Sequence, residues 1–241
     1  MKYDRTALLV LVIGCAAAVA GCGIPQISYL APPIEGTTDT LPPIVRFTHD
    51  PLNDRDTVTY GFLGYEIYYK FYASASAQTQ FDTDRASVED AGPGTVVGVL
   101  GQRGFDRAYA LDRPTRPAIR VEVPEPTDPD DPPLSVSVTI QFQFTSQADK
   151  HAEAQWTVGQ AEVQSLIRDQ DLLAAREPDL GFRIDDLEPG IHEDLPAATA
   201  LTGSTISMAV AILAYGIDYN AFAPIYSTAI VADQLLEISY Q

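Results

Sequence analysis

The chain has 241 residues and a formal net charge of −18, from 33 acidic and 15 basic residues. An acidic body of this kind is repelled by phosphate backbones, which excludes nucleic acid as a partner. Twelve Tyr and nine Phe accompany short runs of Val, Ile and Thr, and these runs are broken by 18 Pro and 16 Gly. Aromatic and β-branched residues suit pleated sheets and Pro and Gly mark turns, so the composition indicates an all-β protein.

The N-terminal segment has the organisation of an export signal. Lys2 and Arg5 precede an uncharged, apolar stretch at 6–20, which is too short to span a bilayer comfortably as a stable anchor. The stretch ends in Val19-Ala20-Gly21-Cys22. This motif resembles the lipobox of bacterial lipoproteins, which implies a signal peptide at 1–21, cleavage before Cys22 and a lipidated tether at 22–26. The cysteine thiolate would be the nucleophile that takes the diacylglycerol.

The cysteines favour this interpretation over the alternative, an ordinary secretory signal. Cys15 lies within the apolar stretch and leaves with the signal, so the mature chain keeps only Cys22 and forms no internal disulfide. Two or three acyl chains together anchor a protein stably. We therefore expect attachment to a membrane of the cell envelope through lipid on Cys22. Gly23, where an Asp is associated with inner-membrane retention, favours the outer membrane.

Alternating and apolar runs predict strands along the mature chain. In chain order, we expect an edge strand at 27–30, strands at 44–49 and 64–72, a short strand at 96–100, an alternating segment at 118–123, a half-buried strand at 135–144, a buried central strand at 205–215 ending at Gly216, and a last segment from 225 to 240. The prolines of 124–133 indicate a rigid acidic loop. Residues 160–176 lack Gly and Pro and carry Val163, Leu166 and Ile167 at helical spacing, which predicts one short helix.

The strand at 64–72 is the clearest early strand, and its two faces differ. A period of two places Tyr65, Ile67, Tyr69 and Phe71 on one face and Glu66, Tyr68, Lys70 and Tyr72 on the other. If the second face is outward, an aromatic surface for a protein or glycan partner is expected. Its residues would be Tyr60, Phe62, Tyr68 and Tyr72. The alternative, which we favour, is that a later segment packs over this face and buries it.

Three segments resemble the fibronectin type III family. Residues 44–51 resemble its second strand, Gly64-Tyr65-Glu66-Ile67-Tyr68-Tyr69 its third, and 209–228 its sixth strand, the following turn and the start of its seventh. The resemblance implies an immunoglobulin/fibronectin III-like antiparallel sandwich over 27–241, with a large elaboration between the third and sixth strands at about 74–203. Phe47 would replace the family's core Trp. Two sandwiches in tandem are the alternative, but no internal repeat supports it.

Catalytic and metal-binding patterns are not found in the sequence. His49, His151 and His192 follow no metal-ligand spacing and are interpreted as surface or loop residues. Carboxylates that could bind calcium cluster at three places, but none matches an EF-hand. We therefore predict no metal and no cofactor, and a calcium-binding loop is the alternative. These places are Asp82 with Asp84, Asp128 with Asp130 and Asp131, and Asp185 with Asp186 and Glu188.

The sequence therefore predicts a membrane-anchored, non-catalytic envelope lipoprotein that acts as a binding or scaffolding module. The alternative is an accessory or hydrolytic domain that acts on envelope or extracellular glycans. Two carboxylates about 5–10 Å apart in a cleft would favour that alternative. A purely structural spacer is a third possibility. The protein or glycan that the module binds is not indicated by the residues, because a sandwich fold hosts many functions.

Overall fold

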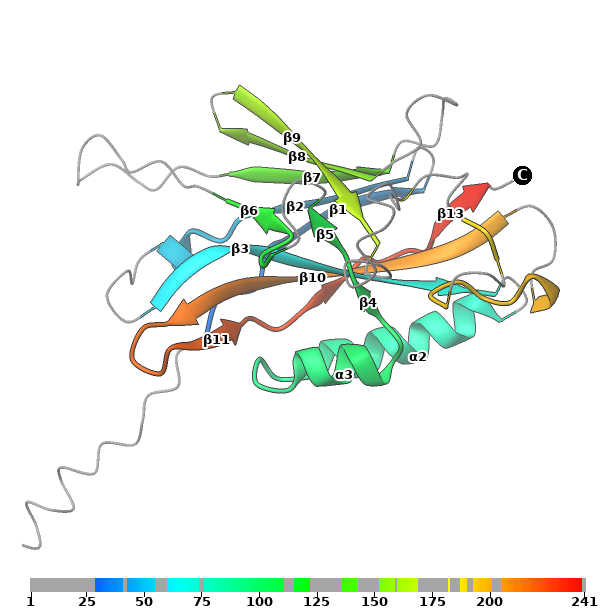
Figure 1. The fold of residues 1–241 in the computed structure, drawn as a ribbon, viewed down its shortest axis with the longest axis horizontal. Coiled ribbons are helices and arrows are strands. Elements are labelled where there is room, and N and C mark those ends of the chain that lie inside the picture. The colour runs from blue at the N-terminus through cyan, green and yellow to red at the C-terminus, as the bar shows by residue number, and fades with distance from the viewer. Residues whose placement is uncertain are drawn as a thin grey trace, which may run out of the picture.

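The computed structural model shows a mostly β protein built from two antiparallel sheets and two α-helices (Figure 1). It describes residues 29–40, 43–54, 60–73, 76–110, 115–121, 136–142, 152–158, 160–168, 182, 187–189, 193–200 and 205–239. The residues of the predicted lipobox, Val19, Ala20, Gly21 and Cys22, and the predicted tether lie outside these ranges.

The first sheet has six strands, all paired with antiparallel neighbours. Their order across the sheet is β1 (Ile34–Thr40), β2 (Pro43–Thr48), β7 (Ser137–Phe142), β8 (Ala152–Val158), β9 (Gln160–Ile167) and β5 (Tyr109–Ala110). β2, β7, β8 and β9 are therefore the interior strands of this sheet. A short 3₁₀ helix, η1 (Pro51–Asp54), follows β2.

The second sheet has seven strands and is organised around two long neighbours, β3 (Tyr60–Tyr72) and β10 (Thr205–Asp218). The other strands are β11 (Ala223–Tyr226), β12 (Ile230–Val231) and β13 (Leu236–Ser239), which pair with β10, and β4 (Asp106–Arg107) and β6 (Ile119–Arg120), which pair with β3. Residues far apart in the chain thus form the centre of the sheet.

The main hydrophobic core lies between the two sheets. Both β2 and β7 contribute buried side chains from one sheet, and β3 and β10 contribute them from the other. Phe47 meets Tyr65 across this core, with ring centroids 4.8 Å apart, so Phe47 is a core residue. The arrangement is that of a β-sandwich, in which two sheets bury one face each against the other.

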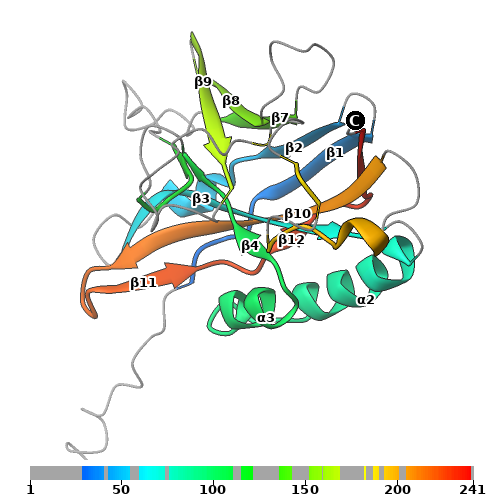
Figure 2. The same cartoon turned by 45° about the vertical axis from the view of Figure 1, so that its right-hand side comes forward.

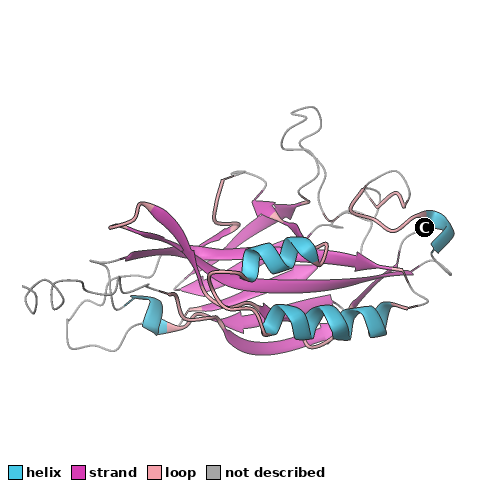
Figure 3. Ribbon diagram, turned by 90° about the horizontal axis from the view of Figure 1, so that it is seen from below, coloured by secondary structure: helices cyan, strands magenta, loops and turns pink. Residues whose placement is uncertain are grey.

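Two helices cover the outer face of the second sheet (Figures 2 and 3). They are α2 (Ala77–Glu89) and α3 (Val96–Gln102). A second hydrophobic cluster, which includes Phe81, Val88, Val96 and Leu100 of the helices, packs on this face. A further 3₁₀ turn, η4, spans Ala198–Ala200. The protein is therefore layered as sheet, sheet and helices.

β10 is apolar on both faces because both faces are buried. Ile206, Met208, Val210 and Ile212 point into the core between the sheets, and alanines at 209 and 211 face the helices. Small side chains on the helix side let α2 and α3 approach the sheet closely. The prediction of a buried central strand is confirmed. The predicted end at Gly216 is wrong, because the strand continues to Asp218 after a register shift between Tyr215 and Gly216.

The strands predicted at 44–49, 64–72 and 135–144 are also confirmed, as β2, β3 and β7. The helix predicted at 160–176 is wrong in its described part, because residues 160–167 form β9 and pair with β8 from Gln160 to Ser165. Pairing to a neighbouring strand overrides the weak helical spacing of three apolar residues.

Two short predicted strands are also wrong. Residues 96–100 lie in α3, where Val96 and Leu100, four residues apart, share one buried helix face. In the segment predicted as an edge strand, Tyr29 and Leu30 are not in a strand, and the edge strand β1 begins at Ile34. In the alternating segment, the strand is limited to Ile119 and Arg120.

Candidate functional site

The predicted aromatic partner surface is not formed as one patch. Tyr68 and Tyr72 are only 5% and 1% exposed. They face the helices, and the Tyr72 and Phe81 rings lie 6.4 Å apart in an edge-on arrangement. The expectation that a later segment buries this face is confirmed, because α2 and α3 lie within the segment predicted as an elaboration.

Tyr60 and Phe62 lie on the opposite face of the sheet, against the core of the sandwich. The cause is a β-bulge: Tyr215 pairs with Gly64 but Gly216 pairs with Phe62, so one residue of β3 is left over and the alternation reverses. Gly64 has φ +146°, and a Cβ at this position would collide with the Ile119 carbonyl oxygen. Period-two reasoning therefore failed for these two residues.

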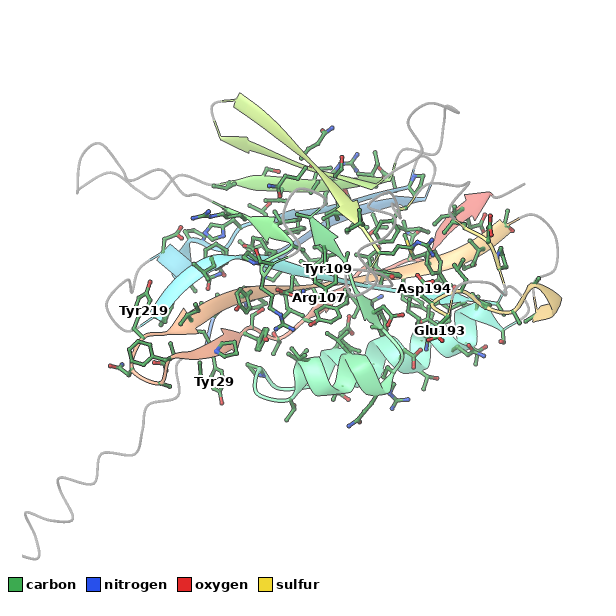
Figure 4. The ribbon with its side chains drawn as sticks, in the orientation of Figure 1. Tyr29, Arg107, Tyr109, Glu193, Asp194 and Tyr219 are labelled. Atoms are coloured by element: carbon green, nitrogen blue, oxygen red, sulfur yellow. The ribbon has the colours of Figure 1, made fainter. Side chains whose placement is uncertain are left out.

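The helix-facing side of β3 carries an ionic cluster around Glu66, which is wholly buried. Its Oε2 lies 3.3 Å from Arg107 Nη1 and its Oε1 lies 3.8 Å from Arg116 Nε. Arg107, on β4, stacks on the Tyr109 ring at 3.7 Å (Figure 4). Arg116 also donates a hydrogen bond to the Tyr226 hydroxyl. We call Glu66, Arg107, Arg116 and Tyr226 the Glu66 cluster.

Burial dominates the electrostatics of the Glu66 cluster. It raises the pKa of the Glu66 carboxyl, and the two guanidinium groups oppose this shift only in part. Burial also raises the pKa of the Tyr226 phenol. For Arg116, burial would lower the pKa, but the Glu66 charge together with Tyr226, Tyr68 and Tyr215 outweighs it and the pKa is raised. Arg107 Nη1 donates a hydrogen bond to Glu66 Oε2, while Glu66 Oε1 and Arg107 Nε have no hydrogen-bond partner among the described residues.

A second cluster binds the helices to the sheet. Lys70 Nζ lies 2.6 Å from Asp84 Oδ2 of α2 and donates to the Arg103 carbonyl oxygen at 2.6 Å. The Tyr72 hydroxyl donates to the same Asp84 oxygen at 3.1 Å. Asp84, one of the carboxylates considered for calcium, is therefore neutralised by a lysine, while Asp82 is exposed and accepts a hydrogen bond from Gln78.

The third cluster joins β9, the loop at 193–200 and β3. Arg168 Nη1 lies 3.0 and 3.1 Å from the two carboxylate oxygens of Asp194, and the ion pair is wholly buried. The Tyr69 hydroxyl donates to Asp194 at 3.0 Å. A buried charge persists only with such partners, so this cluster fixes the loop against the sandwich.

His49 directly follows β2 and belongs to a fourth, buried network, so the interpretation as a loop residue is right and that as a surface residue is wrong. Its Nε2 lies 2.9 Å from Asp54 Oδ2 and its Nδ1 lies 2.7 Å from the Tyr65 hydroxyl. An ionised carboxylate only accepts, so in a neutral ring Nε2–H donates to Asp54 and Nδ1 accepts from the Tyr65 hydroxyl. Burial raises the pKa of Tyr65, which keeps the phenol protonated. The network ties η1 to the sheet.

The remaining candidates give no ligand site in the part of the chain that the structure describes. Glu188 is exposed, and no group of three potential metal-binding side chains occurs among the described residues. The other predicted carboxylates, at 128, 130, 131, 185 and 186, lie outside those residues, as do His151 and His192. Sequence reasoning missed the ionic clusters, although Glu66 and Lys70 within an aromatic strand were a visible signal.

Comparison of the chain with known protein families, curated proteins and solved structures gave no significant match.

Proposed function

We propose that this protein is a lipid-anchored, non-catalytic lipoprotein of the cell envelope that acts as a binding or scaffolding module. The motif Val19-Ala20-Gly21-Cys22 carries the proposal, because it supplies the thiol for the lipid. The first residue that the structure describes is Tyr29, seven residues after Cys22. Among the described residues, no helix is long and apolar enough to cross a bilayer.

The internal arrangement of charge supports a non-catalytic role. A glycan-cleaving site would need two carboxylates that flank a cleft. Glu66, Asp84 and Asp194 instead belong to three different clusters, and each is paired with a cation that joins two elements of the fold. These charges hold layers together, as expected for a scaffold.

The order of the strands supports the finer fold assignment within this proposal. In an immunoglobulin-type sandwich, the third, sixth and seventh strands share one sheet and the first, second and fifth share the other. Here β3 lies beside β10, which pairs with β11, while β2 lies in the opposite sheet between β1 and β7. We therefore propose a fibronectin III-like sandwich whose added helices cover its outer face.

Lipidation is tested by labelling with radioactive palmitate in a bacterium that processes lipoproteins. The wild-type chain is expected to incorporate label and to fractionate with membranes, and Cys22→Ser is expected to lose both properties. If the wild-type chain incorporates no palmitate and associates with membranes to the same extent as C22S, the proposed anchor is overturned. Protease accessibility on intact cells, with a periplasmic marker, then distinguishes surface display from the periplasm.

A further inference from the structure

Three exposed aromatic residues mark one end of the molecule. Tyr29, Tyr219 and Phe222 are 48%, 46% and 87% exposed, and they are the aromatic members among the large hydrophobic side chains exposed in the described residues. Tyr219 and Phe222 belong to the turn that joins β10 to β11. We call these three residues the aromatic end.

The chain preceding β1 reaches the same end of the sheet. Leu30 packs beside Gly216, with its Cδ1 3.2 Å from where a Cβ would lie, and Gly216 is close to the β10–β11 turn. The Tyr219 ring covers Gly61, where a Cβ would collide with the hydroxyl. Figure 4 accordingly shows Tyr29 and Tyr219 at one end of the molecule. Cys22 is seven residues from Tyr29, so a fully extended chain separates them by at most about 25 Å.

The turn holds Phe222 in an unfavourable conformation. Phe222 has φ +50°, the left-handed region that non-glycine residues seldom adopt. Asp218 Oδ1 accepts hydrogen bonds from the backbone N–H groups of Asn220 and Ala221, which fixes the turn. A bulky apolar side chain that is both strained and in water is not explained by packing within the chain, and such outliers gather at functional positions.

Both segments at this end lack charge although the chain is strongly acidic. No Asp, Glu, Lys or Arg occurs in 29–34 or in 219–232, and the neighbouring Asp218 carboxylate accepts the N–H groups of the turn. A surface that approaches lipid headgroups needs this property, because acidic residues are repelled by anionic lipids and are costly at the acyl boundary. Aromatic side chains are the ones enriched at membrane interfaces.

We infer that the aromatic end docks on the lipid bilayer that holds the anchor, with Phe222 inserted at the boundary between headgroups and acyl chains. The inference rests on the proposed lipidation of Cys22, which brings the bilayer within reach. Docking would orient the sandwich, since β3 and β10 run from this end toward α2. The opposite end would then face away from the membrane and be presented to partners.

Docking is tested with the lipidated protein reconstituted in phosphatidylethanolamine and phosphatidylcholine vesicles. Ala221→Cys, beside Phe222, is labelled with an environment-sensitive fluorophore, and lipid on Cys22 leaves the new thiol as the single reactive one. Gln78→Cys, exposed at the start of α2 at the other end of β3, is the matched control. We expect the label at 221 to shift to shorter wavelength and to be quenched by lipids carrying a spin label on the acyl chain, and the label at 78 to show neither change.

Phe222→Ser, added to A221C, is expected to weaken insertion about tenfold, as for loss of a buried phenyl group. Equal, weak quenching at 221 and 78 on vesicles that carry the protein would overturn docking and leave the anchor intact. A shift to shorter wavelength that depends on protein concentration and not on spin-labelled lipid would assign the aromatic end to self-association and also overturn docking. If neither labelled protein floats together with the vesicles, the lipid anchor is absent, and this result would overturn both the proposed anchor and docking.

Discussion

The two faces of β3 are both buried, but they are built from different chemistry. Toward the other sheet, Tyr65, Ile67, Tyr69 and Phe71 form a largely apolar core. Toward the helices, the strand presents Glu66 and Lys70 in alternation with Tyr68 and Tyr72. Apolar burial is non-directional and accepts any surface of the right shape. A buried charge needs a counter-ion at one position, so the second face determines where α2, α3 and β4 are held.

The largest expected effect comes from the apolar face. Phe47→Ala should lower the free energy of unfolding by about 3–5 kcal/mol, because it removes a ring that packs on Tyr65 and leaves a cavity in the sandwich core. Urea unfolding followed by far-UV circular dichroism measures the change. Phe222→Ala is the control with the same atoms removed from an exposed site, and a similar loss for both variants would show that Phe47 is not a core residue.

A smaller, local effect is expected on the ionic face. Asp84→Ala should cost about 2–3 kcal/mol, since it leaves Lys70 and the Tyr72 hydroxyl without their partner in a largely buried site. Asp82→Ala, two residues away on the exposed side of α2, should change stability by less than about 0.5 kcal/mol. Hydrogen exchange should show faster opening of α2 in D84A than in D82A. Equal exchange would mean that Asp84 does not hold the helix.

The Glu66 cluster makes stability depend on pH. Burial raises the pKa of Glu66 in the folded state above its unfolded value, so the folded state favours the protonated form. This contribution is complete below the unfolded pKa and is lost as pH rises through the folded pKa. The free energy of unfolding of wild type, relative to Glu66→Gln, should therefore fall as pH rises above the ordinary carboxyl pKa. A difference that grows with pH would show that Arg107 and Arg116 outweigh burial.

The smallest effect is expected outside both faces and has the opposite sign. Phe222→Gly should raise the free energy of unfolding of the protein in detergent by about 0.5–1 kcal/mol, because glycine adopts φ +50° without a Cβ clash. Thermal unfolding of wild type and F222G measures it. A clear loss of stability would mean that Phe222 packs within the fold, contrary to its 87% exposure.

Strand prediction succeeded where burial and period agreed. β7 alternates between apolar and polar residues, which predicts a strand buried on one face, and β10 is apolar throughout, which predicts a strand buried on both faces. It failed at 160–176, where three apolar residues fit a helix but β8 supplies a hydrogen-bonding edge. It failed again at Tyr60 and Phe62, because one extra residue at the bulge before Gly64 reverses the alternation. A bulge arises from the register between two paired strands, and the sequence of one strand alone does not show that register.

The residues of β3 determined by themselves that one face would be aromatic and the other would mix charge with tyrosine. The motif at 19–22 likewise predicts lipidation from the local sequence alone, without reference to the fold. Tertiary structure decided what each face meets: Arg107 and Arg116 reach Glu66, Asp84 reaches Lys70, and the chain before β1 reaches Gly216 near the end of β10. Local periodicity encodes which side a residue faces, but the partner on that side comes from a distant segment, and its arrival depends on the packing of the whole chain.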